Sequence, residues 1–419
     1  YYPQHLDSTM RQLSELFDLI QPGQRVFVAG SSNEPTALLQ SLATAQLPKD
    51  LEFIQFPLAG FNQTDFTSFN ATARLTTFFM TGALKSADSA RLQFLPMQMR
   101  TVYDYLSNNI DVALIQVAYD VNGVLRLGPN VDFVGAVLGS AGSVIAELNR
   151  GIVAPAGCTE ISPADIDFMF ESDRVLAQMA APTIDAAAAE IGRLVAELIS
   201  DGDCLQTGIG AIPAAILSQL ETKNDLGMHG GLIDDGGMRL IQQGNINGAL
   251  KPIDTGLHVT GMALGSTALY DWLGQTPSVA FRGANHTHEI SVIRQIPNFV
   301  SINSAVEIDI YGQVNAEFAA GRQISGTGGS VDFMRASKAS VGGRSIVDMN
   351  ATARGGSVSR IVPKVELVTA LRTDVDTVVT EYGVADIKYL PNQARAEALI
   401  EIAAPGFRDE LRLQLKSRK

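Results

Sequence analysis

The sequence reads GQRVFVAGSSNEPTALLQSL over residues 23–42 and GDCLQTGIGAIPAAILSQL over residues 202–220. Each stretch holds a glycine, a polar residue, a short apolar run, small residues, a proline and an amphipathic run that ends in leucine. A strand, a glycine turn and a helix that begins near a proline form the start of a βα unit in a parallel sheet. Two such starts, about 180 residues apart, predict two α/β domains of related topology. The alternative is a chance likeness, because βα turns resemble one another.

The hydrophobic pattern elsewhere in the chain fits the same fold class. The expected strands lie at residues 111–118, 300–302, 345–348 and 377–380, and the expected helices lie at 143–148 and 184–199. The pair Asp201-Gly202 would end the second helix, since glycine is common just after a helix C-terminus. We therefore expect an N-terminal domain over residues 1–199 and a C-terminal domain over residues 200–419.

The composition describes a folded protein and excludes several function classes. Of 419 residues, 46% are hydrophobic and 18% are charged, which is unlike a disordered chain. No apolar run reaches the ~18 residues that a membrane span needs. The net charge of −13 argues against nucleic acid or an anionic membrane as partner. The two cysteines, Cys158 and Cys204, have no paired spacing, which fits a reducing cytoplasm and no structural zinc.

Histidines cluster in the middle of the sequence. Four of the five lie between His229 and His288, and the stretch NHTHE covers residues 285–289. This stretch lacks the HExxH spacing that puts two metal ligands on one helical face. We therefore predict no metal site and expect the histidines to make local polar contacts in a cleft.

A glycine turn and a basic segment point to an anionic ligand. The turn is SGTGGSVDF (residues 325–333), and its backbone N–H groups could face an oxyanion or a phosphate. Between residues 320 and 364 there are seven cationic residues against two aspartates, a local balance of +5 in an acidic chain. We favour a phosphorylated ligand over a merely solvated basic face. A tight turn that needs glycine for its backbone angles is the alternative for residues 325–333.

Seven motifs carry a family resemblance and follow one another along the second half of the chain. They are DLGMHGGLIDDG, TGMALGSTALYDWL, FVSINSAVEIDIYGQVNAE, GTGGSVDFMRAS, ATARGGSVSRIVP, VVTEYGVADI and RAEALIEIAAPGFRDEL. Their order and spacing resemble the acetyl-CoA hydrolase/CoA-transferase family, above all its 4-hydroxybutyrate and acetate CoA-transferase types. The first half adds AGSSNEPTALL, DVALIQVAYDVNGVLRLG and QTGIGAIPAAIL, so the resemblance covers nearly the whole chain.

The resemblance implies two open α/β domains with the active site between them and an acyl-CoA substrate. In typical members a glutamate attacks the thioester carbonyl, and the resulting anhydride exchanges with coenzyme A. That glutamate stands in a segment that reads approximately LGIHSEM, where this sequence reads LGMHGGL. The aligned position is Gly231. Gly230 and Leu232 differ from the family pattern too, which indicates natural divergence of the whole loop.

A second departure lies in the facing loop. Where typical members carry an asparagine in a YVNDP-like run, this chain has His288, with Asn285 three residues away. A histidine at this position would add a general acid or base that titrates near neutral pH. The resemblance also implies a second active-site acid at Glu381, whereas the alternation around Glu307 indicates a structural strand position.

The other implied site residues are glycines and cations. The resemblance assigns the oxyanion pocket and the coenzyme A site to the segments around 207–210 and 326–329, and the basic segment would supply phosphate contacts. The residues are Gly208, Gly210, Gly326, Gly328, Gly329, Lys338 and Arg344.

Three functions stay open at this point. Water activated by His288, with or without help from Glu381, could hydrolyse the thioester. Alternatively, Asp234, Asp235 or Glu289 could replace the nucleophile and sustain transfer to a small carboxylate acceptor. The chain could also bind a CoA ester without turnover. In each case we expect no cofactor beyond coenzyme A as substrate or product, a cytoplasmic homodimer or homotetramer, and an acyl group that the sequence does not identify.

Overall fold

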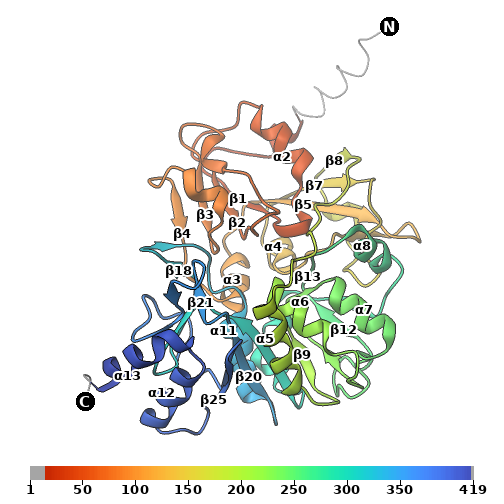
Figure 1. The fold of residues 1–419 in the computed structure, drawn as a ribbon. Helices are drawn as coiled ribbons and strands as arrows, with labels where there is room; N and C mark the ends of the chain where they lie inside the picture. Colours follow the sequence, from red (N-terminus) through yellow and green to blue (C-terminus); the bar gives the residue numbers. More distant parts are fainter. Residues whose placement is uncertain (1–14, 417–419) are drawn as a thin grey trace. The chain divides into compact units, whose positions relative to one another are not determined.

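The computed structural model describes residues 15–416 and divides into two compact units (Figure 1). The first unit comprises the described residues up to Met97, together with Thr101–Met179 and Gly261–Ala284. The second comprises Gln98–Arg100, Ala180–Thr260 and the described residues from Asn285 onward. The division therefore falls near residue 180 rather than at 199, and a later segment returns to the first unit.

The first unit is built on a largely parallel sheet with the strand order β4-β3-β2-β1-β5-β7-β8. Its strands are β1 (Arg25–Val28), β2 (Glu52–Gln55), β3 (Arg74–Thr77), β4 (Leu92–Phe94), β5 (Val112–Tyr119), β6 (Leu125–Leu127), β7 (Ser143–Asn149) and β8 (Phe168–Ser172). Only β6 runs antiparallel, against β5. The chain moves outward from β1 to β4 and then resumes at β5 on the other side. The sheet therefore has a topological switch point between β1 and β5.

Short helices connect these strands. They are η1 (Ser31–Asn33), α2 (Thr36–Ala43), η2 (Phe66–Ser68), η3 (Gly82–Ser86), α3 (Met99–Leu106), α4 (Val134–Leu138), η4 (Pro163–Asp165) and α8 (Thr267–Leu273). The strand β5 reads VALIQVAY and is buried along all but its last residue. A parallel strand covered on both faces is expected to be apolar without alternation. Phe53 of β2 and Phe66 of η2 stack with ring centroids 4.9 Å apart.

The second unit has its own sheet with the strand order β10-β9-β15-β20-β24-β25. These strands are β9 (Cys204–Gln206), β10 (Gly227–Met228), β15 (Phe299–Ser304), β20 (Arg344–Asp348), β24 (Thr377–Thr380) and β25 (Gly383–Asp386). All pairs are parallel except β24 with β25. The switch point lies between β9 and β15, so the first strand of each unit occupies an equivalent place.

Helices and small strands complete the structure. The helices are α5 (Ala186–Glu197), α6 (Ala211–Ser218), α7 (Asp235–Gln243), α9 (Ala284–Thr287), α10 (Ile290–Ile293), α11 (Ser330–Ala339), α12 (Asn392–Glu401), η5 (Pro405–Phe407) and α13 (Arg408–Lys416). The small strands are β11 (Leu232–Ile233), β12 (His258–Thr260), β13 (Met262–Ala263), β14 (Val279–Phe281), β16 (Glu307–Asp309), β17 (Val314–Asn315), β18 (Phe318–Ala319), β19 (Arg322–Gln323), β21 (Thr352–Ala353), β22 (Val358–Ser359) and β23 (Ile361–Val362). No helix within residues 15–416 is long and apolar enough to cross a membrane.

Most of the expected elements are present. Both quoted stretches form a strand, a turn and a helix, and the four expected strands correspond to β5, β15, β20 and β24. The helix expected at residues 184–199 is α5, and Glu307 begins a strand. The helix expected at residues 143–148 is wrong, because this segment is β7, paired in parallel with β5 and β8. Its alanine, glutamate and leucine favour helix, but burial in the sheet prevails.

Candidate active site

Gly231 and His288 lie against each other in the second unit. A β-carbon placed on Gly231 would lie 3.1 Å from Cε1 and 3.2 Å from Nε2 of the His288 imidazole. The backbone of Gly231 is outside the left-handed region, so a side chain there would be opposed by crowding against the imidazole rather than by φ. The absence of a side chain at Gly231 therefore makes room for the imidazole of His288.

The imidazole of His288 is held on three sides. Its Nδ1 atom hydrogen-bonds with Oγ1 of Thr287 at 2.8 Å, and its ring centroid lies 4.4 Å from that of Phe333. Its Nε2 atom faces Gly329, where a β-carbon would overlap the ring. The side chain is 1% exposed, and this burial lowers the pKa of His288 to about 3. The expectation of titration near neutral pH is wrong, because His288 is a neutral imidazole throughout the physiological range.

The carboxylates that could replace a glutamate at Gly231 are used by helices. Asp234 is the N-cap of α7, and its carboxylate accepts from Gly237 N at 2.9 Å. Glu289 caps α10 by accepting from Ser291 N at 2.9 Å and forms an ion pair with Arg100 at 2.7 Å. Asp235 begins α7. Two of the three alternatives are thus committed to caps.

The glycine segments lie just beyond the carboxyl ends of the strands. Gly208 and Gly210 follow β9, and Gly210 begins α6 with φ at 117°, a value that favours glycine. Gly326, Gly328 and Gly329 belong to the turn before α11, and Gly329 is its N-cap. Helix N-termini that lack a side-chain cap present backbone N–H groups to an anion. Both segments are thus uncapped helix starts, where the predicted oxyanion or phosphate contacts would be made by backbone N–H groups.

A cavity opens beside the first of these segments, and Arg360 lines it. Gly210, Ser304 and Asn350 form other parts of its wall. The guanidinium of Arg360 is half-buried, and this desolvation lowers its pKa while the negative charge of Glu381 opposes the shift. Glu381 follows β24 and accepts a hydrogen bond from Ala351 N at 2.8 Å. Arg360 lies in the motif ATARGGSVSRIVP, but sequence reasoning did not single it out.

Lys338 and Arg344 do not reach this cavity. Lys338 pairs with Asp376, which precedes β24, and Arg344 pairs with Asp203, which precedes β9. Arg344 is itself the first residue of β20. These ion pairs therefore lie at the amino ends of the strands, whereas the glycine segments lie at the carboxyl ends. The structure does not bring the two predicted phosphate contacts together with the other predicted site residues.

Three further side chains form a polar cluster, and one of them, His229, lies two residues before Gly231. Ligand atoms of His229, Asp254 and His286 lie within 4.8 Å of one another, and Nε2 of His286 is 2.9 Å from Oδ2 of Asp254. These residue types can hold a metal. Lys251 adds a positive charge nearby, which helps burial to lower the pKa of His229 to about 3. That charge opposes a bound cation. The expected local polar contact is present for His286, with Asp254, whereas neither ring nitrogen of His229 has a hydrogen-bond partner within residues 15–416. Asn285, one residue before His286, lies in α9.

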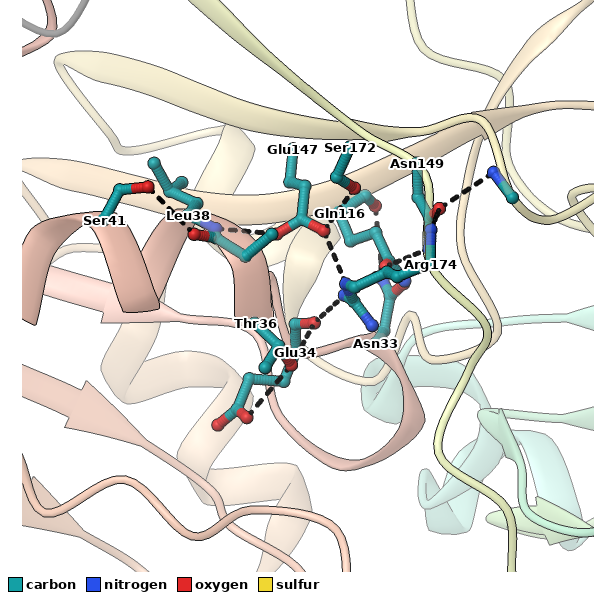
Figure 2. Close-up of polar contacts among 12 residues, drawn as sticks. Asn33, Glu34, Thr36, Leu38, Ser41, Gln116, Glu147, Asn149, Ser172 and Arg174 are labelled. Atoms are coloured by element: carbon teal, nitrogen blue, oxygen red, sulfur yellow. Dashed lines mark hydrogen bonds and ion pairs between the residues drawn. The ribbon is translucent and has the colours of Figure 1, made fainter.

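A buried polar network that sequence reasoning missed lies in the first unit (Figure 2). Arg174 donates from Nε to Glu147 at 2.6 Å, and its Nη2 donates to Gln116 and to the carbonyl of Glu34. Gln116 in turn donates to Asn33 at 2.7 Å. Every buried side-chain nitrogen and oxygen of these residues has a partner within the described part of the chain. A saturated network of this kind positions backbone and offers no group to a ligand.

Comparisons with known proteins match this architecture. Residues 2–177 match the family model of the acetyl-CoA hydrolase/transferase N-terminal domain, and residues 265–415 match that of its C-terminal domain. The chain is 36% identical to a 4-hydroxybutyrate coenzyme A transferase of Clostridium kluyveri over 95% of each chain. It is 36% identical to a butyryl-CoA:acetate CoA-transferase of Anaerostipes caccae over 77% of this chain and 74% of that one. The crystal structure of RipA from Yersinia pestis superposes with a TM-score of 0.88 at 29% identity, covering 97% of this chain and 99% of RipA.

Proposed function

The chain belongs to the acetyl-CoA hydrolase/transferase family, and from that premise we propose that it hydrolyses a small acyl-CoA thioester with His288 as the general base. Relatives include CoA-transferases and acetyl-CoA hydrolases, and both kinds of enzyme act on acyl-CoA. The proposal concerns the reaction that this chain performs without the glutamate that the family resemblance implies.

The packing of Gly231 against His288 carries the proposal. A nucleophilic side chain at position 231 and the imidazole would compete for the same space, because the two approach within 3.2 Å at the level of the first side-chain atom. We call positions 231 and 288 a matched pair, because a larger side chain at one leaves less room for the side chain at the other. A neutral imidazole beside the lost carboxylate can accept a proton from water, which a glycine cannot do.

The proposed step is addition of water to the thioester carbonyl, followed by elimination of the thiolate. Nε2 of His288 takes a proton from water as the water oxygen attacks the thioester carbonyl, and the backbone N–H groups of the glycine segments stabilise the oxyanion. The carbon–sulfur bond then breaks. The proton returns from His288 to the leaving thiolate, so the products are a carboxylic acid and free coenzyme A. The low pKa of His288 makes it a weak base, so most of the acceleration must come from oxyanion stabilisation and positioning.

The placement of the neighbouring carboxylates supports hydrolysis over transfer. Asp234 is a half-buried helix cap that accepts from Gly237 N, and Glu289 is held by both a cap and an ion pair. Either would have to leave its partners to attack a thioester. Transfer by another carboxylate is the second candidate reaction, and binding without turnover is the third.

Coenzyme A release measured with and without an acceptor separates the three. Purified protein is incubated with acetyl-CoA and butyryl-CoA, each in the presence and absence of millimolar acetate or butyrate. Release of thiol without an acceptor is expected. Release that requires the acceptor would establish transfer and overturn the proposal, and binding without release would establish the non-catalytic alternative.

Restoring the glutamate tests the matched pair directly. We expect Gly231→Glu alone to be crowded by His288, whereas Gly231→Glu combined with His288→Asn gives the carboxylate room. The double variant should form a glutamyl-CoA thioester that borohydride reduces, visible as a mass shift of one peptide. An adduct on a carboxylate of the wild-type protein would contradict hydrolysis.

We also expect a cytoplasmic homo-oligomer, a homodimer or homotetramer, as the family resemblance implies. Light scattering of the purified protein tests the oligomeric state, and a monomer would refute it. Acyl-CoA and a small carboxylate are the expected small-molecule partners.

A further inference from the structure

Three side chains of the second unit meet from segments that are far apart in the sequence. His229 follows β10, Asp254 lies in the loop between α7 and β12, and His286 lies in α9. One ligand atom from each lies within 4.8 Å of the other two, and Nε2 of His286 is 2.9 Å from Oδ2 of Asp254. All three residues belong to the same compact unit. The fold of this unit therefore brings two imidazoles and one carboxylate to one place.

His229 is the member of the cluster that lacks a partner. It is 0% exposed, and neither Nδ1 nor Nε2 has a hydrogen-bond partner within residues 15–416. Its backbone is nevertheless fixed, because His229 N donates to the carbonyl of Leu205 at 3.1 Å. Its ring centroid lies 5.7 Å from that of His286. Buried polar groups almost always have a partner, so a fixed ring with two unpartnered nitrogens beside other ligand atoms points to a missing one.

The donor set suits a transition metal. Imidazole nitrogens and a carboxylate oxygen are common ligands of Zn²⁺, and three protein ligands leave the fourth tetrahedral position to water. Neighbouring ligand atoms around Zn²⁺ are roughly 3.3 Å apart, because each metal–ligand bond is about 2.0–2.1 Å long. Binding therefore requires the ligand atoms of the cluster to approach one another by about 1.5 Å at most. The side chains of His286 and Asp254 are 32% and 18% exposed, which gives an ion access from solvent.

Lys251 is the group that opposes a cation at this place. Its side chain is buried, and its ammonium donates to the carbonyls of Leu257 at 2.8 Å and Met228 at 3.2 Å. These bonds direct the ammonium to backbone oxygens, although its charge still acts on His229 through space. We therefore expect Lys251 to weaken the binding of a metal without occupying its ligands.

We propose that His229, Asp254 and His286 bind a divalent transition-metal ion, with Zn²⁺ as the expected ion and water as its fourth ligand. His229 lies two residues before Gly231, and His286 lies two residues before His288. The ion would therefore join the two segments that contain the matched pair and fix the spacing between them. The assignment departs from the prediction of no metal site. That prediction relied on ligand spacing within one helix, whereas these ligands come from three segments.

Zinc binding by the full chain tests the site. Protein dialysed against EDTA and then against buffer is titrated with ZnCl₂ in a calorimeter, and bound zinc is quantified by mass spectrometry of the element after gel filtration. We expect one Zn²⁺ per chain. His286→Asn should weaken binding by about 100-fold or more, because the loss of an outer-shell partner alone weakens it by about 10- to 100-fold. The matched control is His258→Asn, which changes a histidine of the same unit outside the cluster and should bind as the wild type does.

Lys251→Met provides a second test, with an effect of opposite sign. Removal of the opposing charge should tighten zinc binding on the order of tenfold. Three results would overturn the assignment: no zinc bound by the wild type, equal affinities in His286→Asn and His258→Asn, or unchanged affinity in Lys251→Met. Thermal unfolding without metal confirms that each variant is folded. Every readout is binding rather than turnover, so a failure of this proposal is distinct from a failure of the proposed hydrolysis.

Discussion

The carboxyl edges of the two sheets bury polar side chains in different ways. In the first unit, Arg174, Glu147 and Gln116 satisfy one another completely (Figure 2). In the second, both ring nitrogens of His229 and Nδ1 of His258 are buried without a partner in the described chain. His288 is buried against two glycines in the same unit. Saturated groups hold backbone in place, whereas groups without a partner keep their hydrogen-bonding capacity. The buried polar groups of the first unit are therefore structural, whereas some of those in the second unit could take part in chemistry.

The largest expected effect is on activity. His288→Asn should lower the rate of thioester hydrolysis by ~10²-fold, the lower end of the range for a lost general base, because His288 is a weak base and the substitution nearly keeps size and polarity. The matched control is His258→Asn, which changes another buried histidine whose pKa burial lowers to about 4. Steady-state assays with the same acyl-CoA provide the comparison. Equal rates in the His288 variant and the wild type would make His288 a packing residue and remove the proposed mechanism.

The next effect is on stability in the first unit. Arg174→Met leaves the fully buried Glu147 without its cation, and we expect a loss of ~3–5 kcal/mol in the free energy of unfolding. Adding Glu147→Gln should recover a large part of it. Urea unfolding followed by circular dichroism measures both variants. A loss below about 1 kcal/mol would mean that the network is not the structural element described above.

A smaller effect, on coenzyme A binding, should distinguish Arg360 from Lys338. Arg360→Ala should weaken coenzyme A binding by ~1–3 kcal/mol, because its half-buried guanidinium lines the cavity beside Gly210. Lys338→Ala removes a similar charge that is paired with Asp376, so its effect on binding should be slight. Isothermal titration calorimetry compares the two. The reverse order would favour the original assignment of the phosphate contact to Lys338.

The smallest expected effect is that of pH. Because the pKa of His288 is about 3, the base is deprotonated at every pH from 5 to 8, and its titration should change the rate less than twofold. A pKa near 6.5 would instead lower the rate about tenfold for each pH unit below that value. The rate of hydrolysis measured from pH 5 to 8 decides between them. A steep acid limb centred near 6.5 would show that His288 becomes solvated in the active enzyme.

The fold was largely accessible from sequence because its determinants are local. A strand, a turn and a helix follow one another at 25–43 and at 204–218, and each can be read from a short window. The helix predicted for residues 143–148 was wrong because the cause of the strand lies outside that segment. Glu147 suits a helix surface, and its burial in a strand is explained by partners distant in sequence, namely Arg174, Ser172 and the N–H of Leu38.

The candidate site was accessible only in part, for the same reason. Gly231 and His288 could be named from motif positions, and the structure brings their atoms together. Lys338 and Arg344 have the charge that a phosphate contact needs. Their aspartate partners, however, come from other strands, and no local pattern reveals them. The low pKa of His288 likewise depends on burial, which a motif does not report.

The return of residues 261–284 to the first unit affects how the protein is made. In this segment Met179 N bonds to Gly265 O, and Ala156 N bonds to Leu273 O, so α8 is part of the first unit's framework. A ribosome synthesises Ala180–Thr260 before this segment exists. At typical elongation rates the first unit would wait roughly 5–20 s for its last helix, with apolar surface uncovered. The nascent chain therefore exposes this apolar surface during that interval, and a truncation after β8 is expected to aggregate rather than fold.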